Sequence, residues 1–406
     1  MVSGPLVSIL MPTHTRVDVI GHAIQSVLAQ TMSDFELLVV GDGCVAGTAE
    51  VVASFNDPRI RFLDLPKAPY FGYANRNVAL RASRGAYIGF AADDDLLFPD
   101  HLERLLNGLE GGGALAYSKA LWVSTDGIAA PFLTNLTASD ELNTFLQQRN
   151  SIPASCFLYR ADCLPTRDVW REDVEGAADW LLWRRIVGEN ANQPIFYCRT
   201  PTVFHFSAKR MESRYARMPE FATALDIADR ACWWPTPLRV PIPDGETEQS
   251  IYADLMRADP QGWSDTVRSA TSDLIARLAW EDIQIVRPAY AENERQLSVA
   301  RAGFVEARSR LSDTRDEHTQ ALELASSLKR DVSLLEERVH ALALANQKTS
   351  ELLAEANARV TEKSHENDAM RSTLAWKLHE LLQRARSRFC RKRGVMTAGS
   401  ARSEVG

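Results

Sequence analysis

The chain has 406 residues, 45% of them hydrophobic, and a formal net charge of −7 at pH 7. This is the composition of a folded protein with a sizeable core, and its negative charge argues against general affinity for nucleic acid. The six cysteines include no Cys-x-x-Cys pair, so neither a zinc site nor a disulfide framework is indicated. No segment approaches the ~18 apolar residues of a membrane span, and no secretory leader is recognisable. We expect a cytoplasmic protein.

The first hundred residues alternate apolar runs with helical patterns. The predicted strands are 6–11, 35–40, 59–65 and 86–91, and the predicted helices between them are 19–28, 48–55 and 74–82. Strands that alternate with helices form a parallel sheet covered by helices on both faces. In such sheets, ligands bind beyond the carboxyl ends of the strands.

The residues that follow these strands are expected to meet at one edge of the sheet. They are Pro12 and Thr13, Asp42, the loop 67–76, and the three consecutive acids Asp93, Asp94 and Asp95. Three carboxylates after an apolar strand need partners, because burying an unpaired carboxylate costs more than the strand gains. A divalent ion that also holds a phosphate group would supply them. The alternative is a solvated acidic turn that starts a helix, but the convergence of four places at one edge favours the ligand site.

The middle of the chain is less regular. The predicted strands are 114–117, 155–159, 195–198 and 202–206, and the predicted helices are 140–148 and 178–187. Residues 206–290 contain a proline-rich break, and we assign no function to them.

The last hundred residues follow a heptad pattern. Apolar residues recur at alternate steps of three and four from Leu297 to Leu374, which predicts a left-handed coiled coil roughly 100 Å long or more. Asn346 and Asn367 fall at a positions, where a buried amide favours two strands. This pattern favours a parallel homodimer. A single solvated helix is the alternative, but it leaves the apolar stripe over 328–342 uncovered.

A basic segment follows the predicted coil. Six Lys and Arg residues lie between 384 and 393, with Trp376 and Phe389 close by. Such a segment can lie on an anionic membrane surface, and a solvated tail is the equal alternative.

Several of these segments together resemble the family 2 glycosyltransferases of the GT-A fold. The segments that carry the resemblance are 7–13, 26–31 with 35–37, 41–43, 75–77 with 84–88, and 92–95 with 99–100. It covers about residues 5 to 110 continuously, with weaker matches near 179 and 205. The implied fold is α/β: a GT-A, Rossmann-like mixed sheet flanked by helices. We expect this domain at 1–215, a helical, proline-rich extension at 216–290, the coiled coil at 291–378 and the basic tail at 379–406.

The resemblance also implies roles for individual residues at the sheet edge. The implied contacts are Asp42 with the nucleobase, Asp93 with the ribose, Pro12, Thr13 and Arg76 with the nucleotide, Arg210 with the diphosphate, and Asp94, Asp95 and His205 with Mn²⁺ or Mg²⁺. The metal would offset the charge that develops on the leaving diphosphate.

The implied catalytic base is Asp179. Residues 178–186 resemble a family segment in which a Glu–Asp pair opens a helix, but Ala178 stands at the Glu position. One carboxylate is sufficient to take the acceptor proton in a single displacement, which inverts the anomeric centre. The alternatives are a helix-capping role for Asp179, or a base among Glu172, Asp173 and Glu175.

The predicted function is therefore a metal-dependent inverting glycosyltransferase. It would move one sugar from a nucleotide-diphosphate sugar to a glycan or lipid-linked glycan in cell-surface polysaccharide biosynthesis, in the cytoplasm or at the inner face of the membrane. Two alternatives stay open. Ala178 would suit a non-catalytic coiled-coil scaffold with a degenerate GT-A domain. A nucleotidyltransferase would normally carry a glycine-rich phosphate loop, which residues 12–15 do not provide.

Overall fold

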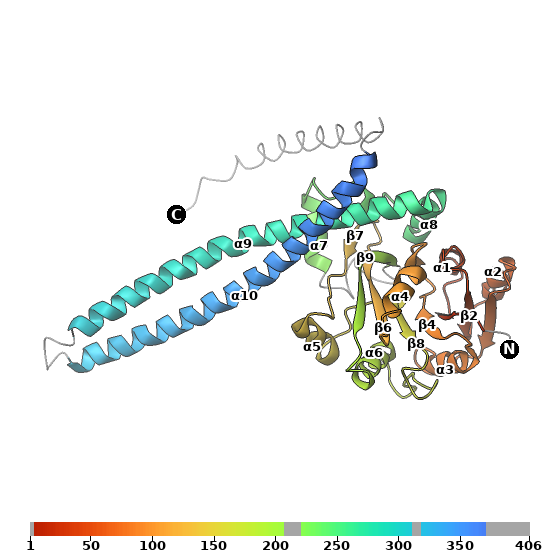
Figure 1. The fold of residues 1–406 in the computed structure, drawn as a ribbon, viewed down its shortest axis with the longest axis horizontal. Helices are drawn as coiled ribbons and strands as arrows, with labels where there is room; N and C mark the ends of the chain where they lie inside the picture. Colours follow the sequence, from red (N-terminus) through yellow and green to blue (C-terminus); the bar gives the residue numbers. More distant parts are fainter. Residues whose placement is uncertain (1–3, 207–220, 311–317, 371–406) are drawn as a thin grey trace. The chain divides into compact units, whose positions relative to one another are not determined.

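The computed structural model describes residues 4–206, 221–310 and 318–370 (Figure 1). The chain divides into two compact units, Met1–Thr271 and Ser272–Gly406. We describe each unit by itself.

The first unit is built on one mixed sheet, which has nine strands within the described residues. The strands are β1 (Val7–Thr13), β2 (Phe35–Asp42), β3 (Ile60–Leu65), β4 (Tyr87–Phe90), β5 (Leu96–Leu97), β6 (Leu115–Val123), β7 (Ala129–Pro131), β8 (Phe157–Arg160) and β9 (Ile195–Phe206). Their order is β3-β2-β1-β4-β8-β6-β9-β5, and β7 pairs with β6. The strands β1 to β4 are parallel, as the alternating pattern predicts. β8 is antiparallel to both β4 and β6, which makes the sheet mixed.

Helices flank this sheet (Figure 1). They are α1 (Ile20–Leu28), α2 (Thr48–Ser54), α3 (Tyr73–Ala82), α4 (His101–Leu109), α5 (Ser139–Gln147), α6 (Ala178–Glu189), α7 (Ala222–Arg230) and α8 (Glu248–Ala258), with one-turn 3-10 helices η1 (Ala154–Cys156) and η3 (Thr236–Leu238). The helix α1 buries Ile20, Ile24 and Val27 on one face, the spacing expected of an amphipathic helix. On α6, the fully buried Trp183 stacks on Phe157 with ring centroids 4.2 Å apart.

Side chains of α1 and of the residues just after it hold the segment that follows the three acids. Gln30, just beyond the helix, donates its amide N–H to the carbonyl of Phe98 at 2.7 Å and accepts the N–H of Leu102 at 3.0 Å. The hydroxyl of Ser26 accepts the N–H of Leu97 at 3.1 Å. These bonds satisfy buried backbone groups and fix β5 and the start of α4 against α1.

The segment after β9 packs back onto the sheet. Tyr252 of α8 is fully buried against Phe204 and Phe206, and its hydroxyl donates to the carbonyl of Gly127 at 3.0 Å. The predicted domain boundary at residue 215 therefore falls inside a compact unit, because the extension as far as Thr271 shares the core of the sheet.

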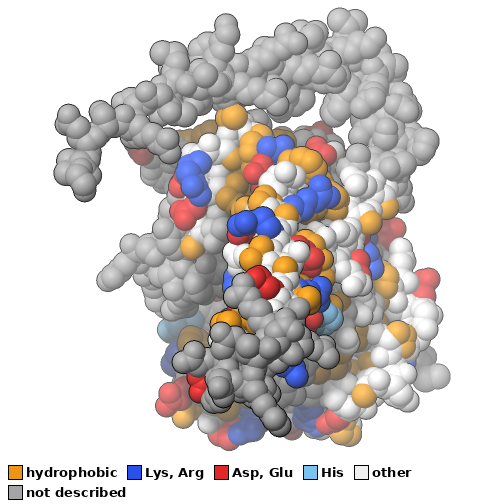
Figure 2. All heavy atoms as spheres, turned by 90° about the vertical axis from the view of Figure 1, so that its left-hand side faces the viewer, with side chains coloured by type: hydrophobic (Ala, Val, Ile, Leu, Met, Phe, Trp, Pro, Cys, Tyr) orange, Lys and Arg blue, Asp and Glu red, His pale blue; other side chains and the backbone are white. Residues whose placement is uncertain are grey.

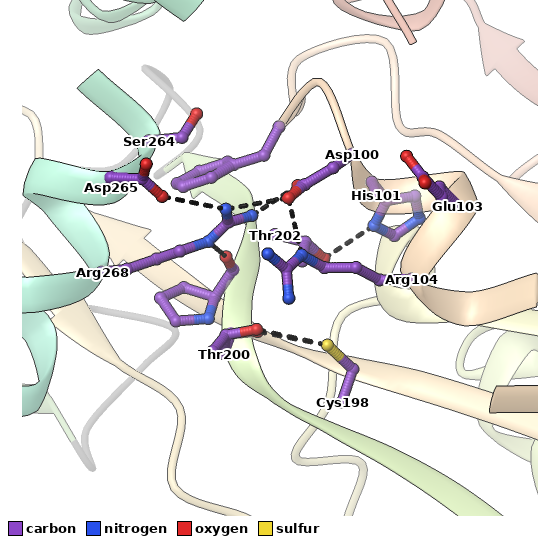
Figure 3. Close-up of polar contacts among 12 residues, drawn as sticks. Asp100, His101, Glu103, Arg104, Cys198, Thr200, Thr202, Ser264, Asp265 and Arg268 are labelled. Atoms are coloured by element: carbon purple, nitrogen blue, oxygen red, sulfur yellow. Dashed lines mark hydrogen bonds and ion pairs between the residues drawn. The ribbon is translucent and has the colours of Figure 1, made fainter. Parts of the chain in front are cut away.

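Arg268 ties the first turns of the long helix α9 (Pro260–Arg310) to this sheet. Its side chain is only 3% exposed, and its guanidinium donates to the two carboxylate oxygens of Asp100 at 2.9 and 2.5 Å (Figure 3). Its Nε donates to the carbonyl of Pro201 at 3.1 Å, and the group lies 5.2 Å from the ring centre of Phe98. A buried guanidinium with this set of acceptors is fully compensated.

The second unit contains the rest of α9 and the helix α10 (His318–Met370). Arg301 of α9 forms an ion pair with Glu336 of α10 at 2.7 Å, and a Cβ added at Gly303 would lie 3.7 Å from a methyl group of Leu328. In one straight helix, residues 301 and 336 would be about 52 Å apart. The two helices therefore run side by side in opposite directions (Figure 1), and the prediction of one uninterrupted helix from 297 to 374 is wrong.

The heptad frame nevertheless identifies the covered face of α10. The frame positions Leu328, Val332, Leu335, Val339 and Leu342 are partly buried, whereas most residues between them are exposed. The periodicity predicts which face is apolar, but it does not say which helix covers that face. Homodimerisation stays a prediction, and the basic tail at 379–406 lies outside the described residues.

Charges of both signs are interleaved on the face of the molecule drawn in Figure 2. Among the described side chains coloured there, basic and acidic groups lie next to each other instead of gathering by sign.

We predict that Arg268→Ala lowers the free energy of unfolding by about 3 kcal/mol, because it leaves Asp100 with less compensation and opens a buried space. Chemical denaturation measures this loss. Arg257→Ala is the matched control, because Arg257 is half exposed and pairs with the exposed Asp254. This change should cost no more than about 1 kcal/mol. Equal losses in the two variants would contradict the role given to Arg268.

A second prediction concerns His101, which is 2% exposed and lies 2.7 Å from the hydroxyl of Thr202 through its Nδ1 (Figure 3). Burial lowers the pKa of His101 to about 3, whereas an unfolded histidine titrates near 6.5. Between these pH values only the unfolded chain binds the proton, so this contribution to stability is lost as the pH falls below about 6.5. The loss reaches about 2 kcal/mol at pH 5.

His101→Gln should remove this part of the pH dependence, measured by denaturation at pH 7.5 and pH 5. The control is His340→Gln, at an exposed position of α10, which should leave the pH dependence as in the wild type. An unchanged pH dependence in His101→Gln would refute the assignment.

Candidate active site

The three consecutive acids lie in the turn between β4 and β5 and are nearly buried. Asp93 and Asp94 are each 6% exposed, and Asp95 is 1% exposed. Two other predicted residues end neighbouring strands: Thr13 ends β1 and Asp42 ends β2, and both are buried. The structure thus brings the predicted residues together at the carboxyl edge of the parallel strands.

Each acid has a partner from a distant part of the sequence. The Nη1 of Arg16 lies 2.9 Å from Oδ1 of Asp93 and 2.6 Å from Oδ2 of Asp94. Asp95 accepts the hydroxyl of Ser155 at 2.5 Å, and its other oxygen lies 2.9 Å from Nδ1 of His205. Burial lowers the pKa of His205, but the carboxylate of Asp95 outweighs this effect and the net pKa is raised. The acids therefore do not form a solvated turn.

Asp94 is buried beside two other carboxylates. Burial, followed by the negative charge of Asp95, raises the pKa of Asp94 to about 7, although Arg16 acts in the opposite direction. A carboxyl group in this state is stabilised by any additional cation that reaches it.

Asp42 holds the loop that follows β3. Its Oδ2 accepts from Nζ of Lys67 at 2.6 Å, and its Oδ1 accepts from the N–H of Ala68 at 2.8 Å and the amide of Asn75 at 2.7 Å. Gly72 passes close to this carboxylate with φ of 72°, and a Cβ there would lie 2.5 Å from it. Only glycine fits this position. Both oxygens of Asp42 thus have partners within the chain, and its contact with a nucleobase stays a prediction.

Arg76 lies against two aromatic rings, Tyr73 and Trp170, which stack on each other with centroids 5.9 Å apart. Its guanidinium carbon is 5.1 Å from the ring centre of Tyr73 and 4.6 Å from that of Trp170. Its Nη2 donates to the carbonyl of Phe71 at 3.3 Å, and its buried Nε has no hydrogen-bond partner among the described residues. Burial lowers the pKa of Arg76. A guanidinium with an unused buried donor and no direct carboxylate partner is suited to an anionic ligand.

Asp179 lies in the first turn of α6, near Arg76. It is partly buried, accepts a bond from the amide of Asn150 at 3.1 Å, and is close enough to act electrostatically on Arg76 and Tyr73. The helix has no side-chain cap, so the alternative capping role is not seen. The preceding Ala177 has φ of 58°, a conformation that residues other than glycine rarely adopt. Such strain is often found beside functional groups.

The alternative bases are arranged differently. Glu172 is exposed and accepts from the amide of Asn77 at 2.8 Å. Asp173 is exposed and pairs with Arg171, and Glu175 is also exposed. Their exposure and separate partners favour Asp179 as the acid that acts at the site.

Sequence reasoning gave no role to several residues that shape this site. The most connected of them is Asn77, whose Oδ1 accepts the N–H groups of Val169 and Trp170 at 3.1 and 2.9 Å and whose amide donates to the carbonyl of Trp170 at 2.9 Å. It therefore positions the ring that stacks on Arg76. Asn77 belongs to the Asn75–Asn77 segment of the resemblance, which was a usable signal. Around Arg16, Lys67 and Ser155, the sequence has no motif that would have identified these three residues as part of the site.

For the remaining predicted site residues we report only their positions in the fold. Pro12 is part of β1, where it lies opposite Val40, and His205 is in β9. Arg210 lies outside the described residues.

The residues present fit a divalent metal. Within the described residues, no three Asp, Glu, His or Cys side chains already form a cluster that could hold an ion. Mg²⁺ in nucleotide sites is usually held by only one or two carboxylates, with phosphate oxygens and water as the other ligands. Asp94 and Asp95 supply two hard oxygen donors, and burial, followed by the charge of Asp95, raises the pKa of Asp94 even with Arg16 beside it.

The mixed sheet with its acidic edge has the arrangement that the resemblance to the GT-A glycosyltransferases leads us to expect. Residues 8–162 match the family model described as "Glycosyl transferase family 2".

The chain is also similar in part to several known proteins. The chain is 35% identical over 124 residues to the succinoglycan biosynthesis protein ExoO of Rhizobium meliloti (strain 1021), covering 30% of this chain and 35% of that protein. It is 36% identical over 189 residues to the chondroitin synthase of Pasteurella multocida (strain Pm70), covering 45% of this chain and 19% of that protein. The matches thus span about a third or less of these relatives. A crystal structure of S. aureus TarS 1–349 in complex with UDP-GlcNAc matches at 17% identity over 88% of this chain and 92% of that one, with a TM-score of 0.41.

We predict that Asn77→Ala lowers the free energy of unfolding by about 2–3 kcal/mol, because it leaves buried backbone groups of residues 169 and 170 without partners. Chemical denaturation followed by tryptophan fluorescence measures the loss. The control is Gln193→Ala, which removes one bond to Asn190 and should cost about 1 kcal/mol or less. A loss no larger than that of the control would argue against the role of Asn77.

Proposed function

We propose that this chain transfers one sugar from a nucleotide-diphosphate sugar to a hydroxyl group of a glycan or lipid-linked glycan, with inversion at the anomeric carbon and with Mn²⁺ or Mg²⁺. The observation that carries the proposal is the convergence of Asp93–Asp95, Arg76 and Asp179 at one sheet edge, within a domain that matches the glycosyltransferase family model. The three acids call for a cation, and the unused donor of Arg76 calls for an anion. A metal-bound diphosphate supplies both.

In this proposal the donor lies along the sheet edge. Asp94 and Asp95, with His205 beside them, would hold the metal, which would neutralise charge on the leaving diphosphate. Arg76 would bind a diphosphate oxygen through its unused donor. The further donor contacts proposed are Pro12, Thr13 and Asp42 with the nucleotide, Asp93 with the ribose, and Arg210 with the diphosphate.

Asp179 would act as the general base. As the acceptor oxygen bonds to the anomeric carbon, the carboxylate takes the proton of that hydroxyl, and the bond from the carbon to the diphosphate oxygen breaks. Attack from the side opposite the leaving group inverts the configuration. The proximity of Asp179 to Arg76 supports this role, because Arg76 would hold the leaving group.

The named relatives indicate the acceptor class. One acts in succinoglycan biosynthesis and another is a chondroitin synthase, both concerned with polysaccharides. We therefore infer polysaccharide biosynthesis and a glycan acceptor for this chain. None of the helices in the described residues is long and apolar enough to cross a membrane. Action in the cytoplasm or at the inner face of the membrane, and pairing of two chains through the helical segment, belong to the same proposal.

The two alternatives are less well supported. A degenerate scaffold would not need the acids and Arg76 to be kept in contact with their partners, and Ala178 is simply a buried residue of α6. The nucleotidyltransferase alternative is disfavoured because residues 8–162 match a glycosyltransferase family model.

The experiment that tests the proposal screens nucleotide sugars for donor hydrolysis and sugar transfer, with Mn²⁺ or with EDTA. We predict activity with one class of donor and its loss in EDTA. Asp179→Asn should lower turnover by about 10²–10⁴-fold, because it removes the general base. Asp95→Asn should lower it at least as strongly, with thermal melting used to show that the fold is kept.

The matched control is Asp173→Asn, since this exposed carboxylate pairs with Arg171 away from the site. It should keep near-normal turnover. Full activity in Asp179→Asn, or loss of activity in Asp173→Asn, would rule out Asp179 as the base.

A further inference from the structure

One charged group at the sheet edge has no role in the chemistry proposed above. A single nitrogen of Arg16 bridges two different carboxylates, 2.9 Å from Asp93 and 2.6 Å from Asp94. These are two of the acids proposed to contact the ribose and the metal. The side chain of Arg16 is 39% exposed, whereas those of Asp93 and Asp94 are 8% and 7% exposed. Arg16 therefore covers the acids from the solvent side.

The backbone of Arg16 is fixed although its side chain is accessible. Its carbonyl accepts the N–H groups of Val19 and Ile20 at 3.2 and 3.0 Å, in the turn that leads into α1. Ile20 is fully buried, so this turn is anchored in the core. A long side chain on a fixed backbone can leave the acids without disturbing the packing beneath it.

Arg16 and a divalent ion compete for the same carboxylate. A guanidinium nitrogen 2.6 Å from Oδ2 of Asp94 lies within the space that a metal would need, because Mg²⁺ binds oxygen at about 2.0–2.1 Å. The two cations would also repel each other strongly at this distance. Arg16 supplies one charge to a group of three acids, whereas a divalent ion supplies two and can also bind phosphate oxygens.

We propose that Arg16 is a built-in counter-ion that a divalent cation must displace from Asp94. In the absence of metal, Arg16 compensates the two outer acids and keeps them in place. When metal arrives, the guanidinium withdraws toward solvent, so Arg16 sets the metal concentration at which the site fills. This inference rests on the metal assignment of the proposed function. Arg16 is a positioning residue here and takes no part in bond making or breaking.

The test uses the full chain and Mn²⁺ alone, without a sugar donor. Binding is measured by calorimetry and by the electron paramagnetic resonance signal of free Mn²⁺. Arg16→Gln should bind Mn²⁺ at least tenfold more tightly than the wild type, because a nearby positive charge has been removed. Arg16→Lys keeps the charge and should stay within about threefold of the wild type.

The matched control is Arg160→Gln. Arg160 also pairs with an aspartate, Asp162, but that pair is exposed at the end of β8. This variant loses the same formal charge and should bind Mn²⁺ as the wild type does. Tightening of equal size in both variants would show an effect of net charge alone and would overturn the role of Arg16.

Thermal unfolding gives a second measurement. Without metal, Arg16→Gln should melt at a lower temperature than the wild type, and Mn²⁺ should raise its melting temperature by more, because tighter binding stabilises the folded state more. If the variant needs metal to fold, recovery of its fold with Mn²⁺ supports the proposal. Failure of Mn²⁺ to restore the fold overturns it.

The outcomes separate this inference from the proposed function. Equal Mn²⁺ affinity in Arg16→Gln and the wild type would refute the counter-ion role but leave sugar transfer standing. Absence of Mn²⁺ binding in both would refute the counter-ion role together with the metal assignment. Tighter Mn²⁺ binding in Arg16→Gln by a chain that transfers no sugar would support Arg16 and refute the glycosyltransferase proposal.

Discussion

Burial of three adjacent carboxylates at the end of β4 is the constraint on which the rest of the site depends. Each acid needs a partner, and the partners come from the turn before α1, from η1 and from β9. These segments are far apart in the sequence, and the strand order of the mixed sheet brings them together. The acids therefore depend on two parts of the fold: the parallel strands β1 to β4 fix their position, and η1 and β9 supply Ser155 and His205.

The loops at the carboxyl edge of the parallel strands are held in place by hydrogen bonds with side chains such as Asp42 and Asn77. Asp42 fixes the loop after β3, and Asn77 fixes the segment that carries Trp170. Together they place Arg76 against the stacked rings of Tyr73 and Trp170. Left-handed backbone at Tyr70 and Ala177, with φ of 55° and 58°, lies in the same two regions. Strain of this kind persists where surrounding contacts determine the conformation, as they do here.

The parallel half of the fold and the membership of the site could be predicted from the sequence, because both follow from local patterns. Apolar runs predict the strands, and parallel strands place the residues that follow them at a common edge. The partners of those residues could not be predicted. Arg16 and Asp93 are 77 positions apart and meet only through the register of β1 and β4. The helical segment shows the same limit, since the heptad frame predicts the covered face of α10 while the covering helix belongs to the same chain.

The partners of Asp94 and Asp95 also distinguish these two candidate metal ligands, which sequence reasoning treated alike. Both oxygens of Asp95 are occupied, one by Ser155 and one by His205, and its side chain is 1% exposed. Among the described residues, the contact of Asp94 is with Arg16 through Oδ2, and this partner is itself accessible to solvent. A carboxylate oxygen can keep a hydrogen bond and bind a metal through its other lone pair, but turning toward the metal strains the bonds that it already makes. Turning would exchange one ion pair at Asp94, whereas at Asp95 it would strain two buried hydrogen bonds that hold η1 and β9 to the turn. For the metal proposed above, these contacts make Asp94 the acid that can turn toward the ion more freely, while Asp95 would bind it from a fixed position beside His205.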